Sequence, residues 1–444
     1  MRATSGDVRT ALGEGGRGHS ASRGSQRMGR AIVVAQIAIT LVLVIGAGLL
    51  GRSLMKVLQV NPGFRVDQIV TMDISLPTTG LLDQKGKARE AIFLSNLIGR
   101  LKQIPGVRQV GATSGLPLDG GLPDGMFLLM RQDEVPDTPA ASDSSSRQFR
   151  IRQFRILFAQ KQRIGIADFC VATDGYFRVL GIPLIRGRSF DERDGPDSAH
   201  VAVISDSLAR ARWPGQNPIG HTIEFGNMDG DYRLLTIVGI VGDVREYGVD
   251  APPRPTVYVN LFQRPRARIA LTMLTDADTQ SVTSAARGIL HGLNPEIPPR
   301  FRTFSQIYSA SLGSRRFNLV LFGFFGIVAL LLATAGVFGV MAYSVSRRTR
   351  EIGVRAALGA QSVDVLTMIL GQGLRTIVSG VAIGVAGSLA LTRTVKSLLF
   401  GVKATDPLTF IAVTLLLVGV ALLACYIPAR RATRVDPMEA LRYE

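Results

Sequence analysis

Cysteine and histidine are scarce in this chain of 444 residues. The two cysteines are Cys170, in a polar stretch, and Cys425, inside an apolar run, so the chain lacks the cysteine pairs that staple a small secreted domain. The four histidines are far apart in sequence, unlike the closely spaced ligands of a zinc site, and we interpret each as a surface or hydrogen-bonded residue. They are His19, His200, His221 and His291.

Motifs for catalysis and nucleotide binding are also missing, since the sequence contains no HExxH, GxSxG or CxxC. The nearest approach to a P-loop runs from Gly80 to Gly86-Lys87-Ala88, but it has one residue too many and lacks the Ser or Thr that holds magnesium. The apolar runs carry no series of acidic residues that could relay protons. We therefore expect no catalytic residue, cofactor or metal, and any transport would need energy from another chain.

The net charge is +17, which raises the question of a nucleic-acid partner. Arginines scattered through the middle of the chain or placed beside apolar runs do not form the clustered basic face, interleaved with aromatic residues, that nucleic-acid binding needs. We expect no nucleic acid. A mean hydropathy of +0.24, concentrated in long apolar runs, is typical of a membrane protein.

Four apolar runs are long enough to cross a bilayer. Ala31–Leu50 has no charge, Phe317–Ser346 has none either, and Leu408–Ile427 forms the last run. Arg375 interrupts the third, where it is expected to snorkel to the interface. The expected order is a basic disordered tail (1–30), the first span (31–55), a folded domain (56–316), the second span (317–346), a surface segment (347–362), the third span (363–394), a loop (395–406), the fourth span (407–428) and a C-terminal tail (429–444).

The folded domain is predicted to be a split α/β subdomain with a β-rich insertion. Strand, helix and strand patterns at 69–76, 85–101 and 107–112 recur as 269–274, 280–293 and 300–303. Between these two βαβ units lies an insertion at about 118–255. Its expected strands are 149–158, 164–172 and 234–244, its expected helices are near 176–180 and at 205–213, and its expected loops are 191–197 and 250–255.

Four spans place both chain ends on one side of the membrane. Lys and Arg residues near the span ends are more numerous on the side that holds the tails and the 347–360 segment, which the positive-inside rule assigns to the cytoplasm. The large domain is therefore expected outside the cytoplasm.

The segment RRTREIGVRAALGA at 347–360 mixes four arginines with apolar residues and cannot cross a bilayer. As a surface helix it pairs Glu351 with Arg355 at i,i+4, aligns Val354 with Leu358 on one stripe, and ends at Gly359. One interpretation is a solvated basic loop that fixes topology. The other is a short helix, joined to two spans, on which a cytoplasmic partner pushes.

Several long motifs, in order, resemble one family. They are AIVVAQIAITLVLVIGAGLLGRSL followed by NPGF, LGIPLIRGRSFDERD, VAVISDSLARARWPGQNPIGHTI, IVGIVGDVREYGVDAPPRPTVYV, the span ending in SRRTREIGVRAALGA, and DPLTF with the C-terminal tail. The chain resembles permease subunits of the MacB/FtsX superfamily of ABC transporters, most closely the duplicated orphan permeases described from acidobacteria.

The resemblance implies four transmembrane helices, a periplasmic porter-like and sabre-like core domain, and an FtsX-like permease domain at 317–437. It further implies a separate cytoplasmic ABC ATPase, a second permease copy or half, the inner membrane as location, and mechanotransmission; a periplasmic adaptor or outer-membrane channel fits the same family. The 347–362 segment would then be the coupling helix. Its expected contact residues are Arg347, Arg348, Arg350, Glu351, Gly353, Val354, Arg355, Leu358 and Gly359.

Other hypotheses stay open at this point. A transmembrane regulator that relays ATPase motion to a periplasmic enzyme would have the same architecture, whereas a membrane-anchored sensor would need an output domain. The substrate is not specified, and macrolide, peptide, lipid and lipoprotein are all compatible. Orphan permeases of this type are usually about twice as long, so the chain could be a C-terminal half, a truncated product or one half of a heterodimer.

Overall fold

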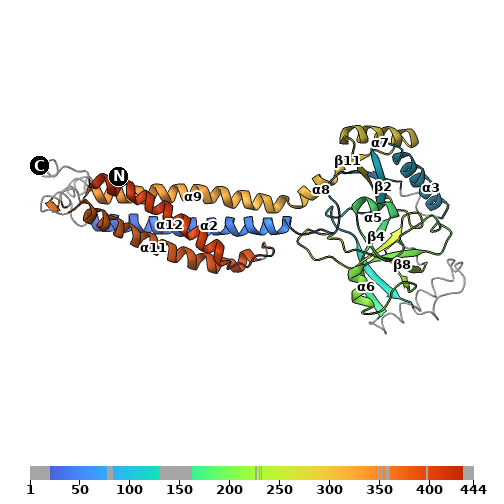
Figure 1. Cartoon of the computed structure of the whole chain (residues 1–444), viewed down its shortest axis with the longest axis horizontal. Helices are drawn as coiled ribbons and strands as arrows, with labels where there is room; N and C mark the ends of the chain where they lie inside the picture. Colours follow the sequence, from blue (N-terminus) through green and yellow to red (C-terminus); the bar gives the residue numbers. More distant parts are fainter. Residues whose placement is uncertain are drawn as a thin grey trace, which may run out of the picture. The chain divides into compact units, whose positions relative to one another are not determined.

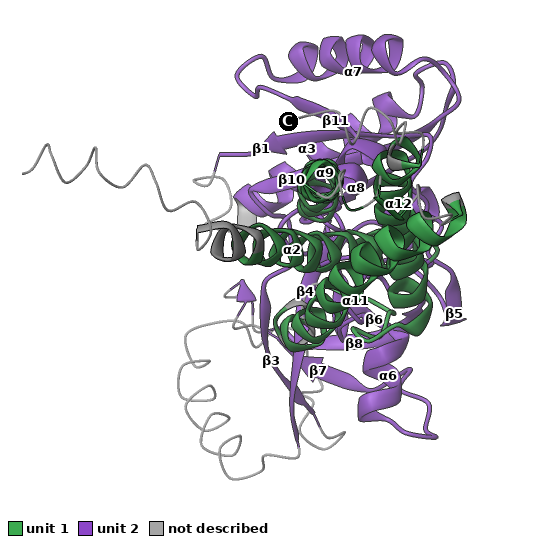
Figure 2. Ribbon diagram, turned by 90° about the vertical axis from the view of Figure 1, so that its left-hand side faces the viewer, with its two compact units in different colours: residues 1–59, 314–444 green, residues 60–313 purple. Residues whose placement is uncertain are grey.

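The chain forms two compact units, which are described separately below. The computed structural model describes residues 21–77, 84–130, 163–225, 228–229, 231, 233–347, 351, 354–355, 361–396 and 399–433, with residues 21–26 described by their backbone alone. One unit comprises residues 1–59 and 314–444, and the other comprises residues 60–313 (Figure 2).

The first unit is helical. Its helices are α2 (Ala21–Leu58), α9 (Gly313–Ser346), α11 (Ser362–Val395) and α12 (Pro407–Ala432), which are labelled in Figure 1. Each contains a stretch long and apolar enough to cross a membrane: Arg27–Leu58, Gly313–Ser346, Val363–Leu391 and Pro407–Arg431. The four spanning helices expected from the sequence are confirmed.

One expectation about the first helix is wrong. Residues 21–30 were assigned to a disordered tail, but α2 begins at Ala21. Once the apolar span has nucleated a helix, extending it by one more residue costs little, and Ala, Ser, Arg and Gln tolerate the helical conformation. The rest of the expected tail, residues 1–20, lies outside the described residues.

Helix α2 contacts the other three helices of this unit: it packs against α11 and α12, and a Cβ atom at Gly326 of α9 would lie 3.3 Å from Val44 Cγ2 of α2. Ile37 and Leu41 are completely buried and Ile45 is 2% exposed, whereas α9 keeps large apolar side chains such as Phe324, Ile327 and Leu331 exposed. In a bilayer, lipid tails cover such a face without cost, so exposure of these residues is typical of a spanning helix.

The second unit contains the split α/β subdomain predicted from the sequence. The first βαβ unit is β1 (Ile69–Ser75), α3 (Gln84–Leu101) and β2 (Val107–Thr113), and the second is β10 (Arg268–Thr275), α7 (Thr279–Leu293) and β11 (Arg300–Thr303). They interlock in the order β11-β1-β10-β2, with antiparallel neighbours. Leu94 and Leu97 of α3 join Val282, Ala286 and Leu290 of α7 in one buried core.

The inserted subdomain is a ring of strands. Within the described residues it contains β3 (Asp124–Leu129), β4 (Ile164–Ala172), β5 (Leu184–Gly187), β6 (Val201–Ser205), β7 (Thr222–Glu224), β8 (Leu235–Val241) and β9 (Thr256–Asn260). The strands pair in the order β4-β3-β7-β8-β6-β9, and β9 also pairs with β4, so these six strands form a closed ring. Strand β5 lies outside the ring and pairs with β8. Two short helices, α5 (Asp174–Leu180) and α6 (Asp206–Arg212), accompany the ring.

The insertion agrees only in part with expectation. Strands at 164–172 and within 234–244 and helices near 176–180 and 205–213 are confirmed. Strands β3, β5, β6, β7 and β9 were not predicted, and the insertion continues beyond residue 255 to Asn260, because β9 pairs with β4 and β6. The strand expected at 149–158 lies outside the described residues.

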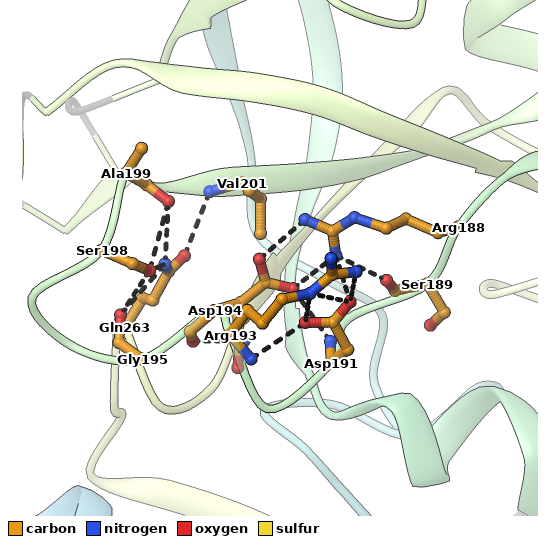
Figure 3. Close-up of polar contacts among 11 residues, drawn as sticks. Arg188, Ser189, Asp191, Arg193, Asp194, Gly195, Ser198, Ala199, Val201 and Gln263 are labelled. Carbon is orange, nitrogen blue, oxygen red and sulfur yellow. Dashed lines mark hydrogen bonds and ion pairs between the residues drawn. The ribbon is translucent and has the colours of Figure 1, made fainter.

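The charged turn expected at 191–197 is an ordered loop held by polar contacts (Figure 3). Arg188 donates to both carboxylate oxygens of Asp194, at 2.7 and 2.8 Å, and Asp194 also accepts from the backbone N–H of Asp191 at 2.9 Å. Gln263 holds the far end of the loop: it donates to Ser198 Oγ at 3.0 Å and accepts from Val201 N–H at 3.1 Å. A bidentate Arg–carboxylate pair of this kind fixes the orientation of the two side chains as well as the distance between them.

Candidate functional site

The candidate coupling segment begins where α9 ends. Arg347 is the first residue after the helix; its backbone N–H donates to the carbonyl oxygen of Tyr343 at 3.2 Å, and its guanidinium lies 5.7 Å from the centroid of the Tyr343 ring. At that distance a cation is attracted to the face of the ring. Both contacts of Arg347 are thus made with Tyr343, in the last turn of α9.

The predicted pair of Glu351 and Arg355 is present. Arg355 Nη2 lies 2.8 Å from Glu351 Oε1, with both side chains about half exposed. Arg355 also reaches α11, because its Nη1 lies 3.1 Å from the sulfur of Met368. Val354 is 41% exposed, so a partner protein can contact it. The segment thus presents an ordered cation and an exposed apolar side chain together.

The other expected contact residues cannot be placed. Arg348, Arg350, Gly353, Leu358 and Gly359 lie outside the described residues. The coupling role assigned to the segment remains a prediction.

The third span was expected to begin at residue 363 and α11 begins at Ser362, but the hydrogen bonds that cap its start were not predicted from the sequence. Asp364, in the first turn, accepts from the backbone N–H of Gln361 at 3.1 Å, and the backbone N–H of Asp364 donates to Gln361 O at 2.9 Å. A carboxylate in the first turn also interacts favourably with the positive end of the helix dipole. The signal was Gln361-Ser-Val-Asp364, which places an acid three residues after the cap.

Glycines bring the spanning helices close together. A Cβ atom at Gly380 would lie 2.7 Å from Ile37 Cγ2, and one at Gly384 would lie 2.9 Å from Leu41 Cδ2, so α11 meets α2 through both glycines. On α2 itself, a Cβ at Gly48 would lie 2.9 Å from Thr409 Cγ2 of α12. Backbones that approach this closely gain van der Waals contact, which drives helix association in a bilayer.

A polar cluster that the sequence did not reveal joins α2 to the start of α12. Asp406 caps α12 by accepting from the backbone N–H of Thr409 at 3.0 Å, and it also forms an ion pair with Arg52 of α2. Hydrogen bonds from Thr409 and the charge of Arg52 hold the pKa of Asp406 below its usual value. Asp406-Pro407 is the sequence signal for such a cap, but its partner on α2 is distant in sequence.

Neither unit offers an obvious metal centre within the described residues, where no group of three or more His, Cys, Asp or Glu residues could hold an ion. His200 is buried, and its Nδ1 lies 3.3 Å from Arg264 Nε. Burial, together with the nearby Arg233 and Arg264, lowers the pKa of His200 to about 3, so its imidazole stays neutral.

Four spanning helices with a large α/β domain inserted between the first and the second define the class: a polytopic membrane protein with an extracytoplasmic core domain. The family model described as the MacB-like periplasmic core domain matches residues 31–289, and the one described as the FtsX-like permease C-terminal domain matches residues 323–437. The first match alone spans more than half of the chain. The chain therefore belongs to the MacB/FtsX family of permeases; the acidobacterial branch stays a resemblance.

The curated relatives are longer than this chain. It is 27% identical over 282 residues to the macrolide export ATP-binding/permease protein MacB of Neisseria meningitidis, covering 60% of this chain and 42% of that protein. It is 28% identical over 288 residues to MacB 2 of Aeromonas hydrophila (61% and 42%), and 26% identical over 281 residues to the probable syringafactin export ATP-binding/permease protein SyfD of Pseudomonas syringae (60% and 40%). The chain thus spans about two fifths of the length of these relatives.

Two solved structures are similar to the core domain. The periplasmic region of MacB from Actinobacillus actinomycetemcomitans has a TM-score of 0.34 at 15% identity, covering 57% of this chain and 97% of that one. The extracellular domain of the transporter YknZ from Gram-positive bacteria has a TM-score of 0.31 at 14% identity, covering 52% and 98%.

Proposed function

We propose that this chain is the permease subunit of an ABC transporter of the mechanotransmission type, driven by a separate cytoplasmic ATPase to export or extract a substrate from the periplasm or inner membrane. The matches to both the permease and the core-domain families support this, as do the activities of the relatives, which are ATP-binding/permease proteins for export. In this proposal both termini and the 347–362 segment are cytoplasmic, the core domain is periplasmic, and a second permease copy or half completes the unit.

The observation that carries the coupling role is the contact of Arg355 with both Glu351 and α11. A partner that pushes on Arg355 or Val354 would push on a residue already attached to a spanning helix. An exposed i,i+4 ion pair contributes only about 0.3–0.5 kcal/mol to helix stability, so stability alone gives little reason for the pair.

Photo-crosslinking tests where the ATPase binds. With p-benzoylphenylalanine replacing Val354 in the full chain in its native membranes, we expect a crosslink to a protein that is also labelled by 8-azido-ATP. The matched control places the same residue at Ile327, which is 62% exposed on α9. Lipid should surround that position, so no ATPase crosslink is expected there. Equal crosslinking at both positions would contradict the proposed docking site.

Charge reversal tests the role of Arg355 with the ATPase found in this way. We expect Arg355→Glu to lower the stimulation of ATP hydrolysis by the permease at least tenfold, because an interface charge pair that loses one partner typically costs 2–5 kcal/mol. The double variant Glu351→Arg/Arg355→Glu restores the intrachain pair but reverses both charges. If Arg355 meets the ATPase, the double variant stays inactive. Full recovery would instead show that only the intrachain pair matters.

A further inference from the structure

A cavity in the core domain lies beside the short helix that leads into α9. This helix, α8 (Phe304–Ser311), begins with a capping box between Thr303 and Gln306 and packs Phe304 and Ile307 into the core. The cavity has a volume of about 380 Å³, within the range of small-molecule sites. It is lined by Leu118, Asp119, Arg300, Arg302, Gln306, Ile307, Ala310 and Ser311.

The cations in the lining differ in their partners. Both terminal nitrogens of Arg302 are used in ion pairs, since Nη1 donates to Asp119 Oδ1 at 2.7 Å and Nη2 donates to Asp73 Oδ2 at 2.7 Å, while its Nε is buried without a partner among the described residues. Arg300, at the first position of the edge strand β11, is exposed and interacts with Asp119 only through its charge; within the described part of the chain it has no ion pair. One guanidinium in the cavity is thus left to bind a ligand.

Gln306 adds neutral donors to this cation. Its carbonyl oxygen is used by the cap, where it accepts from the backbone N–H of Thr303 at 3.1 Å, and its amide NH₂ makes no hydrogen bond to the described residues. Apolar surface from Leu118, Ile307 and Ala310 completes the lining. A guanidinium and amide donors beside an apolar wall suit an amphipathic anion whose phosphate is attached to a hydrocarbon part.

Chain connectivity limits how far this cavity can lie from the first residues of the second span. Ser311 in the lining is six residues before Phe317, the first residue of the uncharged part of α9. Six residues span about 9 Å as a helix and at most about 21 Å when fully extended. The headgroup layer on each side of the hydrocarbon is about 5–8 Å thick. If α9 spans the membrane, lipid headgroups therefore lie within reach of Ser311.

We propose that this cavity binds the phosphate headgroup of an outer-leaflet phospholipid, with Arg300 and Gln306 holding the phosphate and Leu118 and Ala310 covering the start of the acyl chains. The site depends on the lining residues alone and does not require the coupling role proposed above. A bound headgroup would tie the core domain to the membrane surface at the residues that precede α9.

Native mass spectrometry of the full chain, delipidated in detergent and titrated with phosphatidylethanolamine, tests this site. Lipids also bind to the spanning helices of every variant. The test therefore compares the lipid affinity of each variant with that of the wild type. We expect Arg300→Ala to weaken the tightest binding step at least fivefold, and Ala310→Phe to abolish that step by filling the cavity while every charge stays in place. The control Arg186→Ala removes an exposed arginine from β5, away from the cavity, and should bind like the wild type.

The outcomes separate the possible ligands. Identical titrations of wild type, Arg300→Ala and Ala310→Phe would overturn the proposal. So would competition by millimolar inorganic phosphate with the same strength as the lipid, because the cavity would then be a site for a free anion. Trp213, the single tryptophan of the chain, is buried in the core domain and reports by fluorescence whether each variant is folded.

Discussion

Gly175→Ala is expected to destabilise the core domain by about 3 kcal/mol or more, a large fraction of the stability of a typical domain. Gly175 lies in the first turn of α5, and a Cβ atom there would overlap the backbone carbonyl oxygen of Val110 in β2. Gly111, the next residue of β2, meets α5 in the same way from the other side. Backbone cannot move aside as a flexible side chain can, so the helix would have to leave the strand.

Urea unfolding of the full chain, followed by Trp213 fluorescence, measures this loss in the core domain. The matched control is Gly288→Ala, on an exposed turn of α7 where an added Cβ would meet no atom within 4 Å. The same substitution there should stabilise the domain by about 0.5–1 kcal/mol, because alanine is the better helix former. Equal effects at the two positions would show that α5 and β2 are not packed this closely.

Glu246→Gln is expected to raise stability at neutral and alkaline pH and to flatten its pH dependence. Glu246 is 2% exposed, and neither of its carboxyl oxygens has a hydrogen-bond partner within the described residues. Burial, and after it the charge of Asp168, raises the pKa of Glu246 to about 8. Cys170, Tyr176 and Tyr258 are buried with it and feel its charge.

The sign follows from proton binding. Between the ordinary pKa of a glutamate in the unfolded chain, about 4.3, and about 8, the folded state keeps the proton that the unfolded state has released. The stability contributed by the neutral carboxyl is thus fully present at low pH and falls by up to about 1.4 kcal/mol per pH unit as pH rises through this window. Glutamine cannot lose a proton, so the variant should gain most over the wild type at pH 8.

Thermal unfolding of wild type and Glu246→Gln from pH 5 to pH 8, again with Trp213 as the probe, tests this expectation. Glu296→Gln removes the same charge from an exposed site and should leave the pH profile unchanged. Parallel profiles for wild type and Glu246→Gln would mean that the carboxyl is already ionised in the folded state at neutral pH.

Features with strong local periodicity or composition could be predicted from the sequence. The four spans stand out because an apolar run of about twenty residues with at most one charge has few alternatives, and the two βαβ units stand out because strand and helix periods alternate. The Glu351–Arg355 pair was predictable since both members lie one helical turn apart. Each of these signals comes from residues that are neighbours along the chain.

Relations between distant residues were not predictable. Short, fully buried strands such as β6 (Val201–Ser205) and β9 (Thr256–Asn260) show no alternation, so their period carries no information. The closure of the ring by β4 and β9, the ion pair of Arg52 with Asp406, and the Arg300 cavity each join segments more than eighty residues apart. Only the folded arrangement brings such residues together.

The connection between the four strands β11-β1-β10-β2, here called the frame, and the ring of strands has a mechanical consequence. The chain leaves the frame at Ser114 and re-enters it after Leu261, and both crossing points bond to neighbouring residues of β4: Ser114 N–H to Val171 O at 2.8 Å, and Leu261 N–H to Ala172 O at 3.0 Å. Entry and exit thus bond to adjacent residues of β4, next to the place where α5 packs closely on β2. A twist of the frame would be passed to the ring through β4 and α5 together, and an insertion of different size could be exchanged at these two crossing points without changing the frame.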